Sequence, residues 1–160
     1  MLKVINNYSI SDIRQSITYL LDKSSQEEKV RLLVVEIIQD GQNPIAAIYD
    51  WVKKNVTYIS DPIVDGDQSE LFISPAKMVN DYYEGKHLAG DCDDHALLNV
   101  ALLRSIGIKS NVVLLDQKGD GYNHAVAQAY SEEAEKYIII DTTVSFPLGW
   151  EEHYVRRLVI

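Results

Sequence analysis

The apolar residues of this chain change their spacing at Gly107, and this change limits the folds that the chain can adopt. Before Gly107, apolar residues recur every three or four positions, which predicts helices over residues 9–21, 25–41, 43–55, 74–86 and 92–106. After Gly107, segments rich in β-branched residues predict strands over residues 109–116, 124–130, 136–143 and 153–160. Helices followed by strands predict an α+β domain, in which N-terminal helices pack on an antiparallel sheet.

Polar residues stand where these helices are expected to begin, which supports the boundaries. The N-cap candidates of the first four helices are Ser9 or Ser11, Ser25, Asn43 and Ser74. Ser25 and Glu28 also have the spacing of a capping box. Proline follows directly after the last two caps, at the first helical position, where it is well tolerated.

The segments between the helices are short and lack the signs of a domain boundary. Residues 56–60 predict a short strand, residues 61–70 a loop, and residues 85–91 a turn or loop. No linker divides the chain, so we expect a single domain over residues 1–160. An apolar fraction of 46% supplies a core, so we expect folding to need no cofactor.

The net charge of the chain is −9, and no cluster of lysine and arginine interrupts the acidic residues. This balance argues against a nucleic-acid partner and against attraction to an anionic membrane surface. The N-terminus lacks the apolar core of a secretion signal, and no apolar run reaches the roughly 18–20 residues of a membrane span. We therefore expect a cytoplasmic protein, or a virion-associated one if a phage encodes it.

Cys92, the only cysteine of the chain, lies at the expected start of the helix over residues 92–106. A helix N-terminus carries roughly half a positive charge and unpaired N–H groups, and both favour a thiolate over a thiol. The N–H of Cys92 could also stabilise the oxyanion of a tetrahedral intermediate. Gly90 would let a substrate chain approach closely. Cys92 is therefore a candidate nucleophile.

A nucleophilic cysteine needs a base, and the strand pattern predicts one. His124 begins one predicted strand and Asp141 ends the next. If Tyr130 pairs with Glu135 around a four-residue loop, His124 lies directly opposite Asp141, with their Cβ atoms roughly 5 Å apart. One imidazole nitrogen would then contact Asp141 and leave the other for Cys92. A slip of one residue would put the two side chains on opposite faces.

Two other roles remain open for Cys92. The first is that of a small buried thiol, the commonest role of a lone cysteine. The second is a metal ligand: Cys92 and His95 share a helix face, and three further possible ligands are close in sequence, His87, Asp91 and Asp94. Zinc sites more usually use other spacings. A plainer interpretation places Asp93, Asp94 and His95 in a solvated first helical turn, and no role is expected for His153.

Several motifs, in this order, resemble the transglutaminase-like superfamily. The segment "GDCDDHALLNVALLRSIGI" is similar to that family's catalytic-cysteine segment, "NHAVAQAY" to its histidine strand and "YIIIDTT" to its aspartate strand. The earlier "IYDWVKKNVTYISDP" and "SPAKMV" resemble segments of compact bacterial and phage members. The resemblance covers about residues 44–143, which leaves residues 1–42 as a helical N-terminal extension.

The resemblance implies a papain-like fold with a catalytic triad of Cys92, His124 and Asp141. It also implies thiolate attack on an amide and a thioester intermediate, as in peptide hydrolysis, deamidation or protein cross-linking. The expected partner is then a protein or peptide amide substrate, and neither a cofactor nor a metal is expected. The alternative is a non-catalytic transglutaminase-like module used for binding or assembly.

Two residues depart from the family pattern. Val126 stands where a bulky aromatic residue usually follows the histidine, which would reshape the acyl site. Thr142 replaces the proline of the "DPT" pattern and leaves the triad possible. In larger members an upstream tryptophan helps to form the oxyanion hole, and Trp51 and Tyr58 lie in that region, with core packing as their alternative role. The loop over residues 61–70 is expected to form one wall of the cleft.

Overall fold

The computed structural model comprises 160 residues, and the structure describes residues 1–6, 8–61 and 69–160. In chain order, the helices and strands are β1 (Leu2–Asn6), α1 (Ile10–Ser24), α2 (Glu28–Ile37), α3 (Pro44–Asn55), β2 (Val56–Tyr58), β3 (Ser69–Ile73), α4 (Pro75–Tyr83), β4 (Leu88–Gly90), α5 (Cys92–Ser105), β5 (Ser110–Asp116), β6 (His124–Ser131), β7 (Lys136–Ile140) and β8 (Arg156–Val159).

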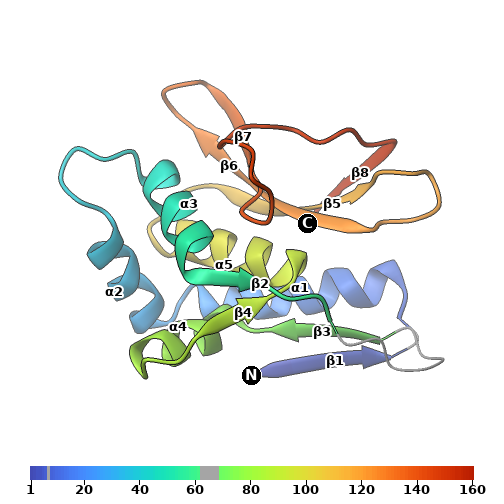
Figure 1. Cartoon of the computed structure of the whole chain (residues 1–160), viewed down its shortest axis with the longest axis horizontal. Helices are drawn as coiled ribbons and strands as arrows, with labels where there is room; N and C mark the ends of the chain where they lie inside the picture. The colour runs from blue at the N-terminus through green and yellow to red at the C-terminus, as the bar shows by residue number, and fades with distance from the viewer. Residues whose placement is uncertain (7, 62–68) are drawn as a thin grey trace.

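A four-stranded antiparallel sheet and a cluster of helices form the two main layers of the molecule. The strands lie in the order β7-β6-β5-β8, and α5 packs against β6. The helices α1, α2, α3 and α4 each contact α5 in turn. Figure 1 shows the sheet on one side of α5, with α4 and the two short sheets on the other side and with α2 and α3 at the left. The α+β fold class, with helices packed on an antiparallel sheet, is therefore confirmed.

The central helix α5 is buried on all sides, because the sheet covers one side and the other helices cover the rest. Its middle section has no accessible side-chain surface at Leu97, Leu98, Val100, Ala101, Leu102 and Leu103. A helix that is apolar around its whole circumference is typical of the interior of a domain. This burial holds the N-terminal end of α5, and with it Cys92, in one place.

The predicted helix caps have mixed outcomes. Ser9 caps α1 in a capping box with Asp12, and the predicted caps of α3 and α4 each accept backbone hydrogen bonds. The predicted capping box of Ser25 is wrong, because α1 continues to residue 24 and uses Ser25 at its own C-terminus. There the hydroxyl of Ser25 donates to the carbonyl of Leu21 at 2.7 Å. The helix α2 begins after Glu27, which makes no side-chain capping bond.

Short strands complete the lower part of the molecule. The strand predicted over residues 56–60 is confirmed as β2, whereas β1, β3 and β4 were not predicted. β1 and β3 pair antiparallel, whereas β2 and β4 pair parallel. No element was predicted for the first six residues, and the turn or loop predicted over residues 85–91 is wrong at residues 88–90, which form β4. Strands of three to five residues contain too few positions to establish a period. Most of the loop predicted over residues 61–70 lies outside the described residues, and residues 69 and 70 belong to β3.

The C-terminal strand β8 forms one edge of the main sheet, where it pairs with β5. It covers only four of the eight residues predicted for this strand. Among the helices that the structure describes, none combines the length and the apolar character needed to cross a bilayer.

Candidate active site

Cys92 is the first residue of α5 and lines a cleft with a volume of about 740 Å³. The side chain of Asp91 caps the helix by accepting the N–H of Asp93 at 3.3 Å, and Asp94 accepts the N–H of Asp91 at 3.4 Å. The N–H of Cys92 makes no hydrogen bond with any residue that the structure describes. The half-buried thiol and a free donor N–H therefore lie together at the positive end of the helix dipole.

Position 90 requires glycine for a structural reason that differs from the expected approach of a substrate chain. A Cβ atom at this position would lie 2.6 Å from Cβ of Asp94 and 2.7 Å from its Oδ2. Real Cβ atoms do not approach so closely, so only glycine leaves room for the Asp94 side chain that completes the capping box of α5. The close approach at Gly90 is therefore made by the side chain of Asp94 in the same chain.

The walls of the cleft combine apolar and acidic side chains. The apolar part comes mainly from α1, β3 and β5, through Ile10, Ile13, Ile17, Phe72 and Leu114. The acidic part consists of Glu70, Asp91, Asp93 and Asp120, with Arg156 as a cation at the rim. An acidic, partly apolar cleft attracts cationic or neutral groups and repels anions.

His124 opens onto the same cleft and lies between Asp141 and Cys92. Its Nε2 is 2.7 Å from Oδ2 of Asp141, which leaves Nδ1 for the sulfur of Cys92. Burial by itself lowers the pKa of the imidazole, but hydrogen bonds to Asp141 and Cys92, together with their charges, raise the pKa of His124 to about 10. The ring is therefore cationic at neutral pH and lies next to the sulfur.

Asp141 is held as an ionised carboxylate by the residues around it. Its side chain is 5% exposed. Its Oδ1 accepts hydrogen bonds from the N–H of Thr143 at 2.9 Å and from the hydroxyl of Thr143 at 2.6 Å. Burial alone would raise the pKa of Asp141, but the hydrogen bonds from His124 and Thr143 lower it below the usual value. Asp141 is thus an oriented anion behind the imidazole.

The β6–β7 hairpin brings His124 to Asp141 in a register that differs from the predicted one. Tyr130 pairs with Tyr137, two positions beyond its predicted partner, because the four-residue turn begins one residue later in the chain. If this register is continued to His124, the residue directly opposite is Thr143, and Asp141 is the diagonal neighbour of His124. The predicted direct opposition is wrong, but a shift of two keeps both side chains on one face, and diagonal neighbours remain within reach.

The three residues after the cysteine are buried, which contradicts the interpretation of a solvated first turn. Asp93, Asp94 and His95 are 5%, 1% and 2% exposed. Desolvation raises the pKa of Asp94 to about 8, raises that of Asp93 well above its usual value and lowers the pKa of His95 to about 4. β3 covers Asp94, which accepts the N–H of Ile73 at 2.7 Å, and the segment after β7 covers His95, whose Nδ1 lies 2.9 Å from the hydroxyl of Thr142.

The described residues do not assemble a metal site around Cys92. His87 contacts Thr57 at 2.8 Å, and His95 contacts Thr142 at 2.9 Å. Within the described part of the chain, the groups with at least three possible ligand atoms within 4.8 Å of one another are His124–Asp141–Glu152, Asp61–Glu70–Asp91 and Asp91–Asp93–Asp94. The two carboxylate groups carry the oxygen ligands that hard cations prefer, and neither includes a cysteine.

The two aromatic residues considered for the oxyanion hole separate in the structure. Trp51 packs edge-on against Tyr82, with ring centroids 5.0 Å apart, and does not line the cleft. Tyr58 lines the cleft together with Cys92. The parallel pairing of β2 with β4 places Tyr58 opposite Gly90, two residues before the cysteine. Only Tyr58 is therefore available at the site.

The two departures from the family pattern have local explanations. Val126 does not line the cleft; it packs in a separate apolar cluster with Val113, Leu115 and Ile139. The expected reshaping of an acyl site by Val126 is therefore not seen at this cleft. The hydroxyl of Thr142 lies 2.9 Å from His95 and accepts a hydrogen bond from Asn99 at 3.2 Å. A proline could not supply that hydroxyl.

One residue near the imidazole was missed by the sequence analysis. Oε2 of Glu152 lies 3.9 Å from Nε2 of His124. Glu152 belongs to the irregular segment between β7 and β8, where neither periodicity nor a motif relates it to a site. Only the path of the chain in space reveals it.

Comparison with solved structures identifies relatives of similar fold. A candidate cysteine protease from Cytophaga hutchinsonii is 26% identical, with a TM-score of 0.54, over 89% of this chain and 49% of that one. A candidate protease from Parabacteroides distasonis is 11% identical, with a TM-score of 0.52, over 79% of this chain and 29% of that one, and shows likeness of fold alone. The chain thus spans about half or less of these proteins. No curated protein matches it.

The sequence model of one protein family, the transglutaminase-like superfamily, matches more than half of the chain. The match covers residues 31–142, which include Cys92, His124 and Asp141. The chain therefore belongs to the transglutaminase-like superfamily, a family of thiol-dependent hydrolases and acyltransferases.

Proposed function

We propose that this chain hydrolyses amide bonds in proteins or peptides, with Cys92 as nucleophile, His124 as acid and base, and Asp141 as the residue that orients the imidazole. The observation that carries the proposal is the position of His124. One ring nitrogen is hydrogen-bonded to a buried carboxylate at 2.7 Å, and the other is left for the only thiol of the chain. This is the arrangement of nucleophile, base and orienting group that covalent catalysis requires.

In the first half of the reaction, the thiolate of Cys92 attacks the amide carbonyl carbon and the carbonyl π electrons move to oxygen. The resulting tetrahedral intermediate collapses, the C–N bond breaks, and the imidazolium of His124 gives its proton to the leaving amine. A thioester on Cys92 and a neutral imidazole remain. Asp141 stabilises the imidazolium before this transfer without taking a proton itself.

In the second half, neutral His124 removes a proton from water, and the hydroxide attacks the thioester carbonyl. Collapse of the second intermediate expels the thiolate and releases the carboxylic acid. His124 holds the proton again, so the thiolate–imidazolium pair is restored. An amine in place of water would make the same residues catalyse transamidation.

The backbone N–H of Cys92 and the hydroxyl of Tyr58 are the proposed donors to the oxyanion. The N–H has no partner among the described residues, and Tyr58 shares the cleft with the cysteine. The N–H lies at the N-terminus of α5, whose dipole stabilises negative charge. The ring centroid of Tyr58 lies 6.3 Å from that of His95, in the first turn of the same helix. Trp51 is not proposed for this role, because its ring packs against Tyr82.

Two observations support hydrolysis of basic or neutral amide substrates. The carboxylates of Glu70, Asp91 and Asp120 outnumber the cations Arg156 and His124 along the cleft, which disfavours anionic segments. Asp93 does not count toward this charge, because burial raises its pKa. The relative from Cytophaga hutchinsonii, at 26% identity, is described as a candidate cysteine protease. Water is therefore the proposed acyl acceptor and a peptide bond the proposed substrate.

Alkylation by iodoacetamide at pH 6 tests the proposal, because any label must lie on Cys92. We expect rapid labelling of the wild type, at least about tenfold slower labelling of His124→Ala, and none of Cys92→Ala, which should remain folded. Incubation with a panel of peptide amides should give a thioester mass adduct and a free acid. A Cys92 that resists alkylation at pH 6, in a folded protein, would overturn the proposal and favour a non-catalytic binding module.

A further inference from the structure

The segment between β7 and β8 brings a second carboxylate to the imidazole of His124. Oε2 of Glu152 lies 3.9 Å from Nε2, the same nitrogen that bonds to Asp141 at 2.7 Å. Glu152 lies beyond the 31–142 region that matches the family, so it is a feature of this chain's own C-terminal segment. Its side chain is 26% exposed, which limits solvent screening without removing it.

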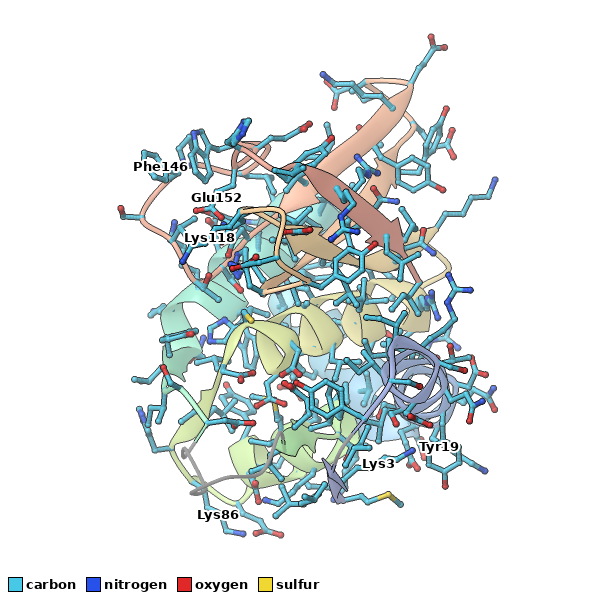
Figure 2. All side chains as sticks on the ribbon, turned by 90° about the vertical axis from the view of Figure 1, so that its right-hand side faces the viewer. Lys3, Tyr19, Lys86, Lys118, Phe146 and Glu152 are labelled. Atoms are coloured by element: carbon cyan, nitrogen blue, oxygen red, sulfur yellow. The ribbon has the colours of Figure 1, made fainter. Side chains whose placement is uncertain are left out.

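Glu152 is held in this position by the loop between β5 and β6. The side-chain amide of Gln117 donates a hydrogen bond to Oε2 of Glu152. Gln117 is itself fixed by Asn123, through bonds of 2.9 Å from its N–H and 2.7 Å to its side-chain oxygen. Figure 2 shows Glu152 beside the loop that carries Lys118.

The backbone on either side of Glu152 is also anchored. The N–H of Val155 donates to the carbonyl of Asp116 at 2.7 Å, and the N–H of Gly149 donates to the carbonyl of Ile139 at 3.0 Å. Both ends of the short segment are therefore tied to the main sheet. Since the path of the backbone is fixed, the approach of Glu152 to His124 does not depend on a free side chain alone.

We propose that Glu152 is a positioning residue, which shares Nε2 of His124 with Asp141, stabilises the protonated ring and acts as a reserve acceptor when the Asp141 bond is broken. The other titratable groups that act on His124 are Cys92 on α5 and Asp141 after β7. Among the residues that the structure describes, the carboxylates with an oxygen atom within 4 Å of Nε2 are those of Asp141 and Glu152. Any effect of Glu152 on catalysis rests on the proposed function, whereas its effect on the protonation of the His124 ring does not.

Electrostatics sets the size of the expected effect. Two opposite charges about 4 Å apart, in a partly exposed site, stabilise the ionised pair enough to shift a pKa by roughly one unit. Removal of the Glu152 charge should therefore make the imidazole of His124 roughly tenfold easier to deprotonate. Glutamine at this position keeps the length of the side chain and removes only the charge.

The titration of His124, followed by NMR of isotopically labelled histidine, tests the inference without a substrate. We expect the pKa of His124 to fall by roughly one unit in Glu152→Gln. In Glu151→Gln, which removes the same charge from the exposed neighbouring residue, the pKa should stay within about 0.2 units of the wild-type value. Equal pKa values in the two variants would overturn the inference.

A second measurement tests the reserve role, with alkylation of Cys92 at pH 6 as the readout. We expect Asp141→Ala to slow alkylation, and Asp141→Ala with Glu152→Gln to slow it at least about tenfold further. Asp141→Ala with Glu151→Gln should match Asp141→Ala alone, and a double variant no slower than this control would contradict the reserve role. A wild-type Cys92 that resists alkylation would overturn the proposed function, while the NMR result would still decide the role of Glu152.

Discussion

His95 and Thr142 lie 2.9 Å apart, joined by a buried hydrogen bond between Nδ1 and the threonine hydroxyl. His95 belongs to the first turn of α5, three residues after Cys92, and Thr142 directly follows Asp141. The same hydroxyl accepts a hydrogen bond from Asn99, one turn further along α5. This contact ties the helix that carries the thiol to the chain that carries the carboxylate.

Replacement of Thr142 by valine should destabilise the fold, because valine keeps the shape but removes the hydroxyl that satisfies His95 and Asn99. An unsatisfied buried polar group costs about 1–3 kcal/mol. We expect the free energy of unfolding in urea to fall by that amount. Thr18→Val, at an exposed position of α1, serves as the control and should change it by less than about 0.5 kcal/mol. Equal effects of the two substitutions would refute the prediction.

Removal of the Tyr58 hydroxyl should slow the chemical step, if that hydroxyl stabilises the oxyanion. Loss of one such donor typically lowers kcat by about 10²–10³-fold. We expect Tyr58→Phe to lower kcat for a peptide amide with little change in KM. Tyr137→Phe, on a residue that is 43% exposed and packs against Tyr130, should leave both constants unchanged. A Tyr58→Phe enzyme with wild-type kcat would exclude this residue from the oxyanion hole.

The contacts of His124 should make the stability of the protein depend on pH above neutrality. Its pKa is raised from 6.5 to about 10, by Asp141 and Cys92 against the effect of burial, so protonated His124 stabilises the folded state. This contribution is fully present below pH 6.5 and is lost as pH rises through 10. The difference in unfolding free energy between the wild type and His124→Gln should therefore shrink by a few kcal/mol between pH 6 and pH 10. A constant difference over that range would contradict the assigned protonation.

The buried carboxyl of Asp93 should make the fold less stable as pH rises. Desolvation raises its folded pKa well above 3.8, so the folded state must keep this group protonated or bear the cost of ionising it. That loss begins near the unfolded pKa and grows with pH. We expect Asp93→Asn, in metal-free buffer, to be more stable than the wild type at pH 8 and similar to it near pH 4. Urea unfolding at the two pH values provides the test, and a gain that does not grow with pH would show the prediction to be wrong.

Truncation in the middle of α5 should have a large effect on stability. Leu98 is fully buried, and its replacement by alanine leaves a cavity that typically costs about 2–5 kcal/mol. Leu32 on α2 is 48% exposed, so Leu32→Ala should cost less than about 1 kcal/mol. Thermal and urea unfolding of both variants compare the two costs directly. Similar losses would contradict the central position of α5 in the core.

Local signals in the sequence were sufficient for the helices that begin with a capping side chain and proline. Asn43 and Ser74 cap α3 and α4, because each forms its hydrogen bonds within three residues of its own position. The N-terminal position of Cys92 on α5 was predicted from the apolar positions over residues 92–106, and the observed cap, Asp91, was not predicted. By contrast, the cap predicted at Ser25 failed, because a neighbouring helix extended to the same residue.

The contact between His124 and Asp141 shows how a prediction can reach the right pair through the wrong register. Pattern alone indicated which face each residue occupies, since alternation repeats every two positions. It did not determine the exact partner, which depends on where the turn begins. The burial of the first turn of α5 was also missed, because it depends on segments distant in sequence: β3 contacts Asp94, and Thr142 contacts His95.

The sequence by itself therefore determined the α+β class, most helix starts, the family motifs and the placing of Cys92, His124 and Asp141 on elements that can meet. These properties depend on periodicity and on hydrogen bonds between residues close in the chain. Only the tertiary structure decided the register of the hairpin, the position of Tyr58 in the cleft, the buried turn after Cys92 and the approach of Glu152 to the imidazole. Those features arise from contacts between segments far apart in sequence, and their free energy depends on burial and distance, which no local pattern contains.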